Sequence, residues 1–290
     1  MNINLSDIGN NAVVQSVIYL FVSCVMLFFS KFLFDKFSIF KPEAEVKNSN
    51  YTAIIAFCGY IIGMAFILVG AFVGPSSRTF RLDLVMYIAY ALLGMFLMTT
   101  SGFVTRKIML NRFDNAKELL QDKNIGTADV YFGFYIAHGL IIAACVNGEV
   151  GGLISSVFYY VLSVCFMFLF LRVYDFMTPY SIHEELENDN YAVGIALAGN
   201  IIAIGLILMK ATLGDVVGWK SSLITYFVDL SAIFLMLPVV RYVLGNFIVK
   251  AININKEIKK NNVAAGLIEF TCITCFALLV FFMVDFTVAI

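Results

Sequence analysis

The chain has 290 residues, of which 61% are hydrophobic and only 13% are charged, and its mean hydropathy is +0.91. A soluble domain of this length needs far more polar surface than this composition can supply. The net charge of −1 also removes the electrostatic basis for nucleic-acid binding. We therefore expect an integral protein of the lipid bilayer with no nucleic-acid partner.

Eight apolar blocks are long enough to cross a bilayer as helices, since about 20 helical residues span roughly 30 Å of hydrocarbon. The blocks do not alternate between polar and apolar residues as the strands of a membrane barrel would. We therefore predict an all-α, polytopic membrane protein with eight transmembrane helices. In chain order they lie near residues 11–34, 51–73, 82–105, 125–147, 152–174, 191–213, 221–243 and 263–286.

The first half of the chain is repeated in the second. Residues 17–74 and 157–214 overlay without a gap when the sequence is shifted by 140 positions. Four predicted helices fall in each copy, so each copy begins and ends on the same side of the membrane. We therefore predict two parallel four-helix repeats, at residues 1–148 and 149–290, related by an axis along the membrane normal. The identical pairs include Tyr19/Tyr159, Asp35/Asp175, Asn50/Asn190, Gly59/Gly199 and Gly74/Gly214.

Basic residues are distributed unevenly between the two sides. Fifteen of the 19 Lys and Arg residues lie in or beside the segments that follow the first, third, fifth and seventh predicted helices. Of the other four, Arg78, Arg81 and Lys220 lie on the opposite side and Lys210 lies within a helix. Because loops rich in Lys and Arg stay in the cytoplasm, we expect both termini outside it.

Two of the basic segments, 106–123 and 241–260, have the spacing of helices that continue past the bilayer. One interpretation is a solvated helix end that contacts anionic lipid. The alternative is a docking surface for a cytoplasmic protein partner.

An asparagine followed by small residues opens several of the predicted helices. Asn50, Asn124, Asn190 and Asn262 each stand at a cytoplasmic helix start, where an Asn side chain can accept an unpaired backbone N–H. We interpret these four residues as helix N-caps.

Residues 178–199 and 262–266 resemble a known bacterial membrane family, the domain of unknown function 350. The first segment contains Thr-Pro-Tyr, two acidic residues and then Asn with a run of small residues, and the second is another Asn with small residues. The copy at about 10–147 departs from this pattern, since Lys41-Pro42 stands where Thr-Pro is expected. The resemblance implies a four-helix unit used in multiples, and so a homo-oligomer in the bacterial inner (plasma) membrane. It implies no activity, although the family is associated with envelope maintenance and ESCRT-like membrane-remodelling proteins.

Small residues on one face of a helix allow close helix packing in lipid. Gly59 and Gly63 lie four positions apart, and Gly199 and Ala203 match them in the second repeat. We interpret these residues as packing positions and expect the helices at 51–73 and 191–213 to lie centrally. All six cysteines lie in or beside apolar blocks, and we interpret them as small buried hydrophobic residues.

Several polar side chains fall at membrane depth, where a charge is costly and usually faces protein or water. At a rise of about 1.5 Å per residue, Asp229 lies near the middle of the bilayer and Glu269 roughly 10 Å from its cytoplasmic side. One hypothesis is a polar path or proton-linked cation site between the repeats. The alternative is that the acids are hydrogen-bonded and fix helix register, while Lys210 extends to the outer surface. The residues of the predicted path are Asp229, Glu269, Tyr90, Tyr131, Asn200 and Lys210.

The sequence contains no P-loop, nucleophile elbow or HExxH motif, so we expect no enzyme, no cofactor and no metal site. Two functions remain. The first is a small channel or transporter with a polar path between the repeats. The second is a non-catalytic scaffold or envelope-maintenance protein that recruits a cytoplasmic membrane-remodelling partner.

Overall fold

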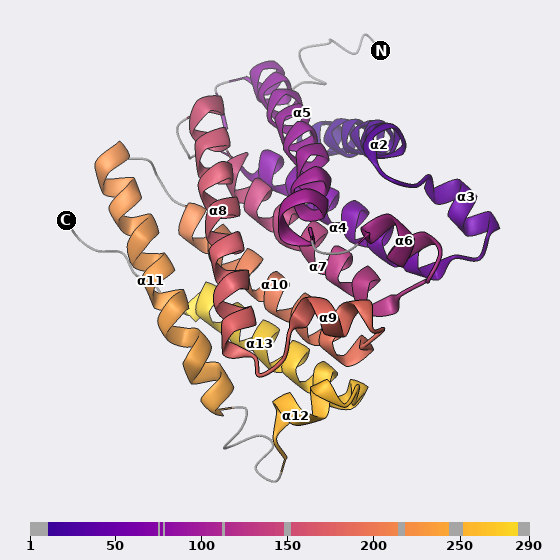
Figure 1. The fold of residues 1–290 in the computed structure, drawn as a ribbon. Helices are drawn as coiled ribbons and strands as arrows, with labels where there is room; N and C mark the ends of the chain where they lie inside the picture. The colour runs from indigo at the N-terminus through magenta and orange to yellow at the C-terminus, as the bar shows by residue number, and fades with distance from the viewer. Residues whose placement is uncertain are drawn as a thin grey trace.

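A computed structural model describes residues 11–74, 76–77, 79–111, 114–147, 152–213, 218–243 and 252–283. Over these residues the protein is all-helical, which confirms the predicted class. The elements, labelled in Figure 1, are α2 (Ala12–Phe37), α3 (Pro42–Lys47), α4 (Tyr51–Val73), α5 (Phe80–Val104), η1 (Thr105–Met109), α6 (Asn115–Leu120), α7 (Ile125–Cys145), α8 (Leu153–Met177), α9 (Ile182–Glu187), α10 (Tyr191–Thr212), α11 (Trp219–Val243), α12 (Ile254–Lys259) and α13 (Val263–Met283).

Seven helices in the described part of the chain are long and apolar enough to cross a membrane. They are α2, α4, α5 with η1, α7, α8, α10 and α13. The eighth predicted span corresponds to α11, a helix of 25 residues that is not among these seven.

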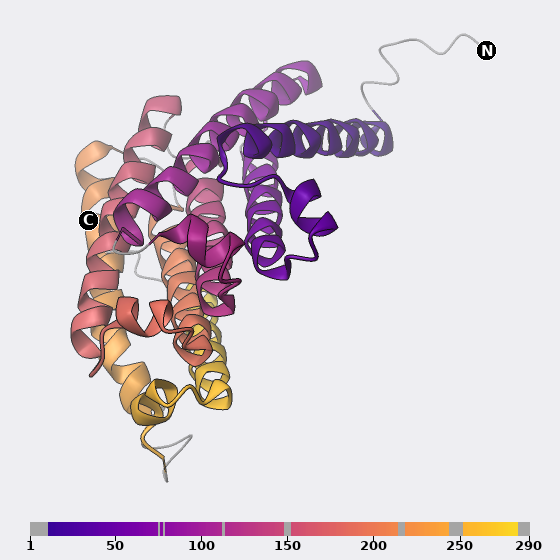
Figure 2. The same cartoon turned by 45° about the vertical axis from the view of Figure 1, so that its right-hand side comes forward.

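The long helices form two layers. The first is a row in which α4 packs on α7, α7 on α10 and α10 on α13. The second contains α5, which packs on α4 and α7, then α8, which packs on α7 and α10, and α11, which packs on α10 and α13. At the end of this layer α2 contacts α4 and α5, and Figure 2 shows it extending away from the rest of the bundle.

Glycines bring the helices of the first layer into direct backbone contact. A Cβ built on Gly59 would lie 2.7 Å from the Cα of Phe132, and one on Gly199 would lie 2.5 Å from the Cα of Phe270. Gly63 lies against the backbone of Tyr135. The predicted packing glycines therefore bind α4 to α7 and α10 to α13, and they do not join α4 to α10.

The central position is shared by α7 and α10, so the expectation that the helix at 51–73 lies centrally is wrong. In the most apolar stretches of α7 and α10, 89% of residues are buried, against 44% in α4. The physical reason is that α4 has a row neighbour on one side only, whereas α7 and α10 each have two. Several cysteines predicted to be buried are exposed on outward helix faces, namely Cys24, Cys58, Cys165 and Cys275.

A six-residue helix precedes each helix of the row. These short helices are α3, α6, α9 and α12, and each is followed by a residue of positive φ and then by an asparagine. The basic segments at 106–123 and 241–260 are therefore not continuous helices. In the first, the chain turns after Met109 before α6 begins, because Asp114 caps a new helix. In the second, α11 ends at Val243 and α12 starts at Ile254, and residues 244–251 lie outside the described part.

Among the described residues, the pattern of long helix, six-residue helix and asparagine-preceded row helix occurs four times, in α2–α4, α5–α7, α8–α10 and α11–α13. We call each of these a unit. The structure therefore contains a repeat half as long as the one visible in the sequence. The side chains of Asn50, Asn124 and Asn190 accept from backbone N–H groups of the first turn, which confirms three of the predicted N-caps.

Candidate functional site

A buried acid lies inside the second repeat. Glu269, in the second turn of α13, is 2% exposed. Its Oε1 accepts from Tyr174 Oη at 2.9 Å and from Asn200 Nδ2 at 3.1 Å. Tyr174 comes from the end of α8 and Asn200 from the middle of α10, so three helices converge on one carboxyl oxygen.

The acid sits about 9 Å along α13 from its first residue, given a rise of about 1.5 Å per residue. Burying a carboxylate at this depth costs several kcal/mol unless donors surround it. Two donors on Oε1 offset part of that cost. Asn200 also donates to the carbonyl of Ala196 at 2.8 Å, while its own buried Oδ1 accepts no hydrogen bond from the described residues.

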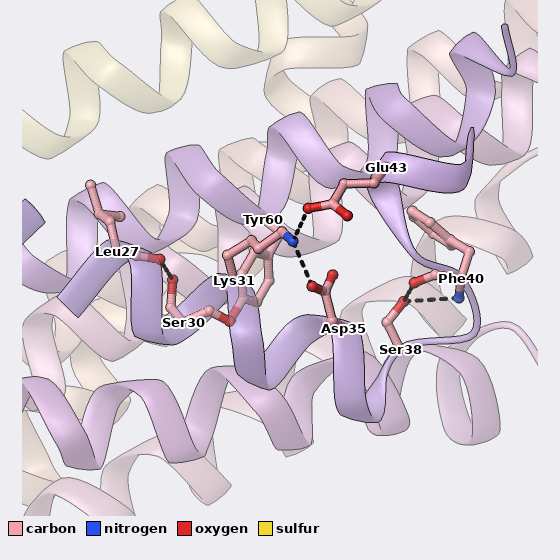
Figure 3. Close-up of polar contacts among 8 residues, drawn as sticks. All are labelled: Leu27, Ser30, Lys31, Asp35, Ser38, Phe40, Glu43 and Tyr60. Atoms are coloured by element: carbon pink, nitrogen blue, oxygen red, sulfur yellow. Dashed lines mark hydrogen bonds and ion pairs between the residues drawn. The ribbon is translucent and has the colours of Figure 1, made fainter. Parts of the chain in front are cut away.

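The first repeat has aromatic residues at the same three positions. Phe34, Tyr60 and Tyr131 stand where the second repeat has Tyr174, Asn200 and Glu269. Tyr60 Oη donates to the carbonyl of Ser30 at 2.9 Å (Figure 3), and Tyr131 Oη is buried without a partner among the described residues. The rings of Phe34 and Tyr60 pack at 4.6 Å between centroids. The acid and its two donors are therefore confined to the second repeat.

A cavity of about 580 Å³ lies beside this aromatic cluster, among α2, α4, α5 and α7. Its lining is mostly apolar, with Tyr60, Tyr131 and Arg106 among the polar contributors. Close to Tyr60, α2 is tied to α3, because Lys31 Nζ pairs with both Asp35 and Glu43 at 2.7 Å (Figure 3). The Lys31 ammonium holds the pKa of the Glu43 carboxyl below its ordinary value.

The other predicted residues of the polar path lie elsewhere. Tyr90 lines a separate cavity of about 540 Å³ that also contains Asp83 and Asn147. Lys210 lies near the far end of α10 and donates to the carbonyl of Phe281 at 2.9 Å. Asp229 is partly buried on α11. Of the six residues, the structure joins Glu269 and Asn200 by a hydrogen bond and places Tyr90 and Tyr131 in different cavities.

Close backbone contacts join the two repeats. A Cβ on Gly133 of α7 would lie 3.0 Å from the Cα of Ala198 on α10, and Gly194 lies directly against Gly126. Asn200 lies on the opposite side of α10, which faces α13, and meets Glu269 of α13 there. The hydrogen-bonded pair of the predicted polar path therefore lies within the second repeat.

Tyr174 is the residue of this cluster that the sequence does not reveal. Its hydroxyl meets a carboxylate 95 positions further along the chain. No local spacing relates two residues so far apart, and only the packing of α8, α10 and α13 brings them together.

The chain is similar to known protein sequences along both repeats. The family described as Domain of Unknown Function (DUF350) matches residues 7–146 and again 149–284. UPF0719 transmembrane protein YshE of Bacillus subtilis is 29% identical over 123 residues, which cover 41% of this chain and 84% of that relative. A UPF0719 transmembrane protein of Aquifex aeolicus is 26% identical over 133 residues, 46% of this chain and 49% of that relative. No solved structure matches the chain.

Proposed function

This chain belongs to the DUF350 family of membrane proteins, of which it carries two tandem copies, and we propose that it is a small channel or transporter that moves protons or small cations through its second repeat. The observation that carries the proposal is the carboxyl of Glu269, buried at membrane depth and held by Tyr174 and Asn200. Acidic residues within transmembrane segments are rare because they are costly, and they commonly mark ion pathways and proton relays.

The three side chains supply the chemistry that a proton or a monovalent cation requires. Glu269 offers a carboxylate, Asn200 a buried carbonyl oxygen without a described donor, and Tyr174 a hydroxyl. A cation that enters the cluster would gain these oxygens as ligands, and a proton would neutralise the carboxylate. Because the first repeat has only aromatic groups at the same positions, we assign one site to each chain.

The topology that we propose has eight spans in two parallel four-helix repeats. The eighth span is α11, whose 25 residues would extend for about 37 Å, enough to cross the hydrocarbon. The excess of Lys and Arg near one end of the bundle supports an orientation with both termini outside the cytoplasm, and the bacterial transmembrane relatives support the inner (plasma) membrane as location.

The test is ion flux in liposomes that contain the purified protein. We expect Glu269→Gln to abolish proton or cation flux, and Tyr174→Phe and Asn200→Ala to reduce it. The matched control is Glu187→Gln, which removes a carboxylate from an exposed position of α9 and should leave flux unchanged. Flux that survives Glu269→Gln at the wild-type rate would exclude this site.

A second candidate function is a non-catalytic scaffold that recruits a cytoplasmic membrane-remodelling protein. It is favoured by the layer of short helices at one end of the bundle, where the exposed Lys256 and Lys259 of α12 flank the buried Ile258. We expect the double charge reversal Lys256→Glu and Lys259→Glu to release such a partner from membranes without changing flux. Retention of the partner on the variant would count against the scaffold.

A further inference from the structure

Neighbouring row helices contact each other at three places, α4 with α7, α7 with α10 and α10 with α13, and we call each contact a joint. The three joints share one register. Counted from the asparagine before each helix, the ninth residue of one helix meets the eighth residue of the next. In each joint the ninth residue is glycine, and a Cβ on it would approach the opposing Cα to 3.0 Å or less. The pairs are Gly59 with Phe132, Gly133 with Ala198 and Gly199 with Phe270.

A polar contact accompanies each joint at the amino-terminal end of the helices. The asparagine of one unit donates to a backbone carbonyl in the short helix of the next, and the aliphatic residue that carries this carbonyl is fully buried, at 0% exposure. The contacts are Asn50 with Leu119 at 3.0 Å, Asn124 with Leu186 at 2.6 Å and Asn190 with Ile258 at 3.2 Å.

The fourth asparagine and the fourth aliphatic residue lie at opposite ends of the row, and both are exposed. Asn262, before α13, donates to Glu257 of its own unit at 3.1 Å. Val46, in α3, occupies the position of Leu119, Leu186 and Ile258 but is 63% exposed. The two halves of one further joint are therefore present in a single chain, where they cannot meet.

The helices at the two ends of the row, α4 and α13, are also less buried than the helices between them. In the most apolar stretch of α13 only 33% of residues are buried, and 44% in α4, against 89% in α7 and α10. The helices of the second layer show the same difference. In α5 and α8, each of which covers a joint, 39% of the residues in the most apolar stretch are buried, whereas in α2 none are. By its place in the first unit, α2 would cover a joint between α4 and a row helix that precedes it.

We propose that a second copy of this chain docks its α4 and α2 on the exposed face of α13, which repeats between molecules the joint that α7 and α10 make within one. In this register Thr271 opposes Cys58 of the second copy. Cys275 opposes Ala65, because the thirteenth residue of one row helix meets the fifteenth of the next, as Gly63 meets Gly139 and Ala137 meets Gly205. The same contact would let Asn262 donate to the carbonyl of Val46 of the second copy.

The residues on the two faces suit this contact. Cys58, Ala65, Thr271 and Cys275 are all small and all exposed, and small residues are what close helix association in lipid requires. Thr271 replaces the glycine of the three internal joints, so the helix axes lie farther apart in the joint between molecules. Because the two faces differ, the contact is head-to-tail and generates a ring or a filament of copies, not an isolated two-fold dimer.

Disulfide formation tests this register directly. At the equivalent internal position, a Cβ on Gly133 would lie 3.3 Å from the Cβ of Ala198, close to the separation of about 3.5–4.5 Å in a disulfide. In a chain whose other five native cysteines are replaced by alanine, we expect Thr271→Cys to form intermolecular disulfides with Cys58 in oxidised membranes. Non-reducing gels would then show covalent oligomers that reductant converts to single chains.

Two controls define the result. Phe96→Cys places a thiol at a 64%-exposed position of α5, at a depth similar to that of Cys58. We expect at most background cross-linking from this variant. Replacement of Cys58 by alanine should abolish the Thr271→Cys product. Cross-linking no stronger than that of Phe96→Cys, or a product that persists without Cys58, would overturn the proposal.

A second variant tests assembly without a covalent bond. Ala65 is exposed in the single chain, so Ala65→Phe should fold normally but block the approach of α13. We expect wild type to show the mass of an oligomer by light scattering in nanodiscs and Ala65→Phe to show that of one chain. Leu92→Phe, on an exposed position of α5, should remain oligomeric. A wild-type protein with the mass of one chain, or an Ala65→Phe oligomer of unchanged mass, would overturn the proposal.

Discussion

Gly59→Ala should destabilise the protein, although alanine is the better helix former. The added Cβ would lie 2.7 Å from the Cα and 2.8 Å from the carbonyl oxygen of Phe132, both of them backbone atoms of α7. To restore a contact of about 3.5 Å, α4 and α7 must separate by roughly 0.8 Å, which forfeits a quarter to a half of the local dispersion energy. We expect a loss of about 1–3 kcal/mol in the free energy of unfolding.

The assay is reversible unfolding in mixed detergent micelles, followed by the fluorescence of Trp219, the single tryptophan of the chain. Gly218→Ala is a control without steric conflict, because a Cβ on this residue, which lies just before α11, would have no atom within 4 Å. The intrinsic helix preference for alanine over glycine, about 1 kcal/mol, acts in the opposite direction to the steric term. A Gly59→Ala variant as stable as wild type, or more stable, would therefore refute the close approach of α4 and α7.

Three further predictions concern the short-helix layer and the topology. Asn124→Ala should lower the free energy of unfolding by about 3 kcal/mol, because it removes a helix cap and leaves buried partners in both repeats unpaired. Asn48→Ala, at an exposed position, should change it little. Equal unfolding midpoints for the two variants would contradict this. Burial raises the pKa of Glu118 above its ordinary value of 4.5, so its stabilising contribution should be present at lower pH and be lost as pH rises through the raised pKa. Melting temperatures should show this slope in wild type and not in Glu118→Gln. Tags at both termini should react with membrane-impermeant reagents from outside intact cells, and labelling only after lysis would reverse the proposed orientation.

Local features of the fold could be read from the sequence because their causes are local. Apolar blocks of about 20 residues predict membrane helices from length alone. An asparagine before a helix predicts an N-cap, since its side chain reaches a backbone N–H only three residues away, as Asn124 does to Thr127. Gly59 and Gly199 could be identified as packing positions for the same reason, because a missing side chain permits close approach whatever the partner.

Which helices pack against one another could not be predicted in this way. The sequence suggested that the helices at 51–73 and 191–213 both lie centrally, but α7 takes the place expected of α4. For a polar residue the sequence indicates only its depth in the membrane, and depth does not distinguish one side of a helix bundle from another. Tyr90 and Tyr131 consequently face different cavities, while Glu269 and Asn200 meet.

By itself, the sequence determined that this is a helical protein of the membrane, that it is duplicated and where its row helices start. Hydropathy and caps depend on residues within a few turns of one another, and the duplication shows when the sequence is compared with itself. Only the tertiary structure decided that the duplicated halves each contain two similar units, that Tyr174 and Asn200 hold Glu269, and that the row ends in two exposed faces. These facts depend on which helix lies beside which. That order is set by the fit of surfaces dozens of residues apart, such as Gly133 against Ala198.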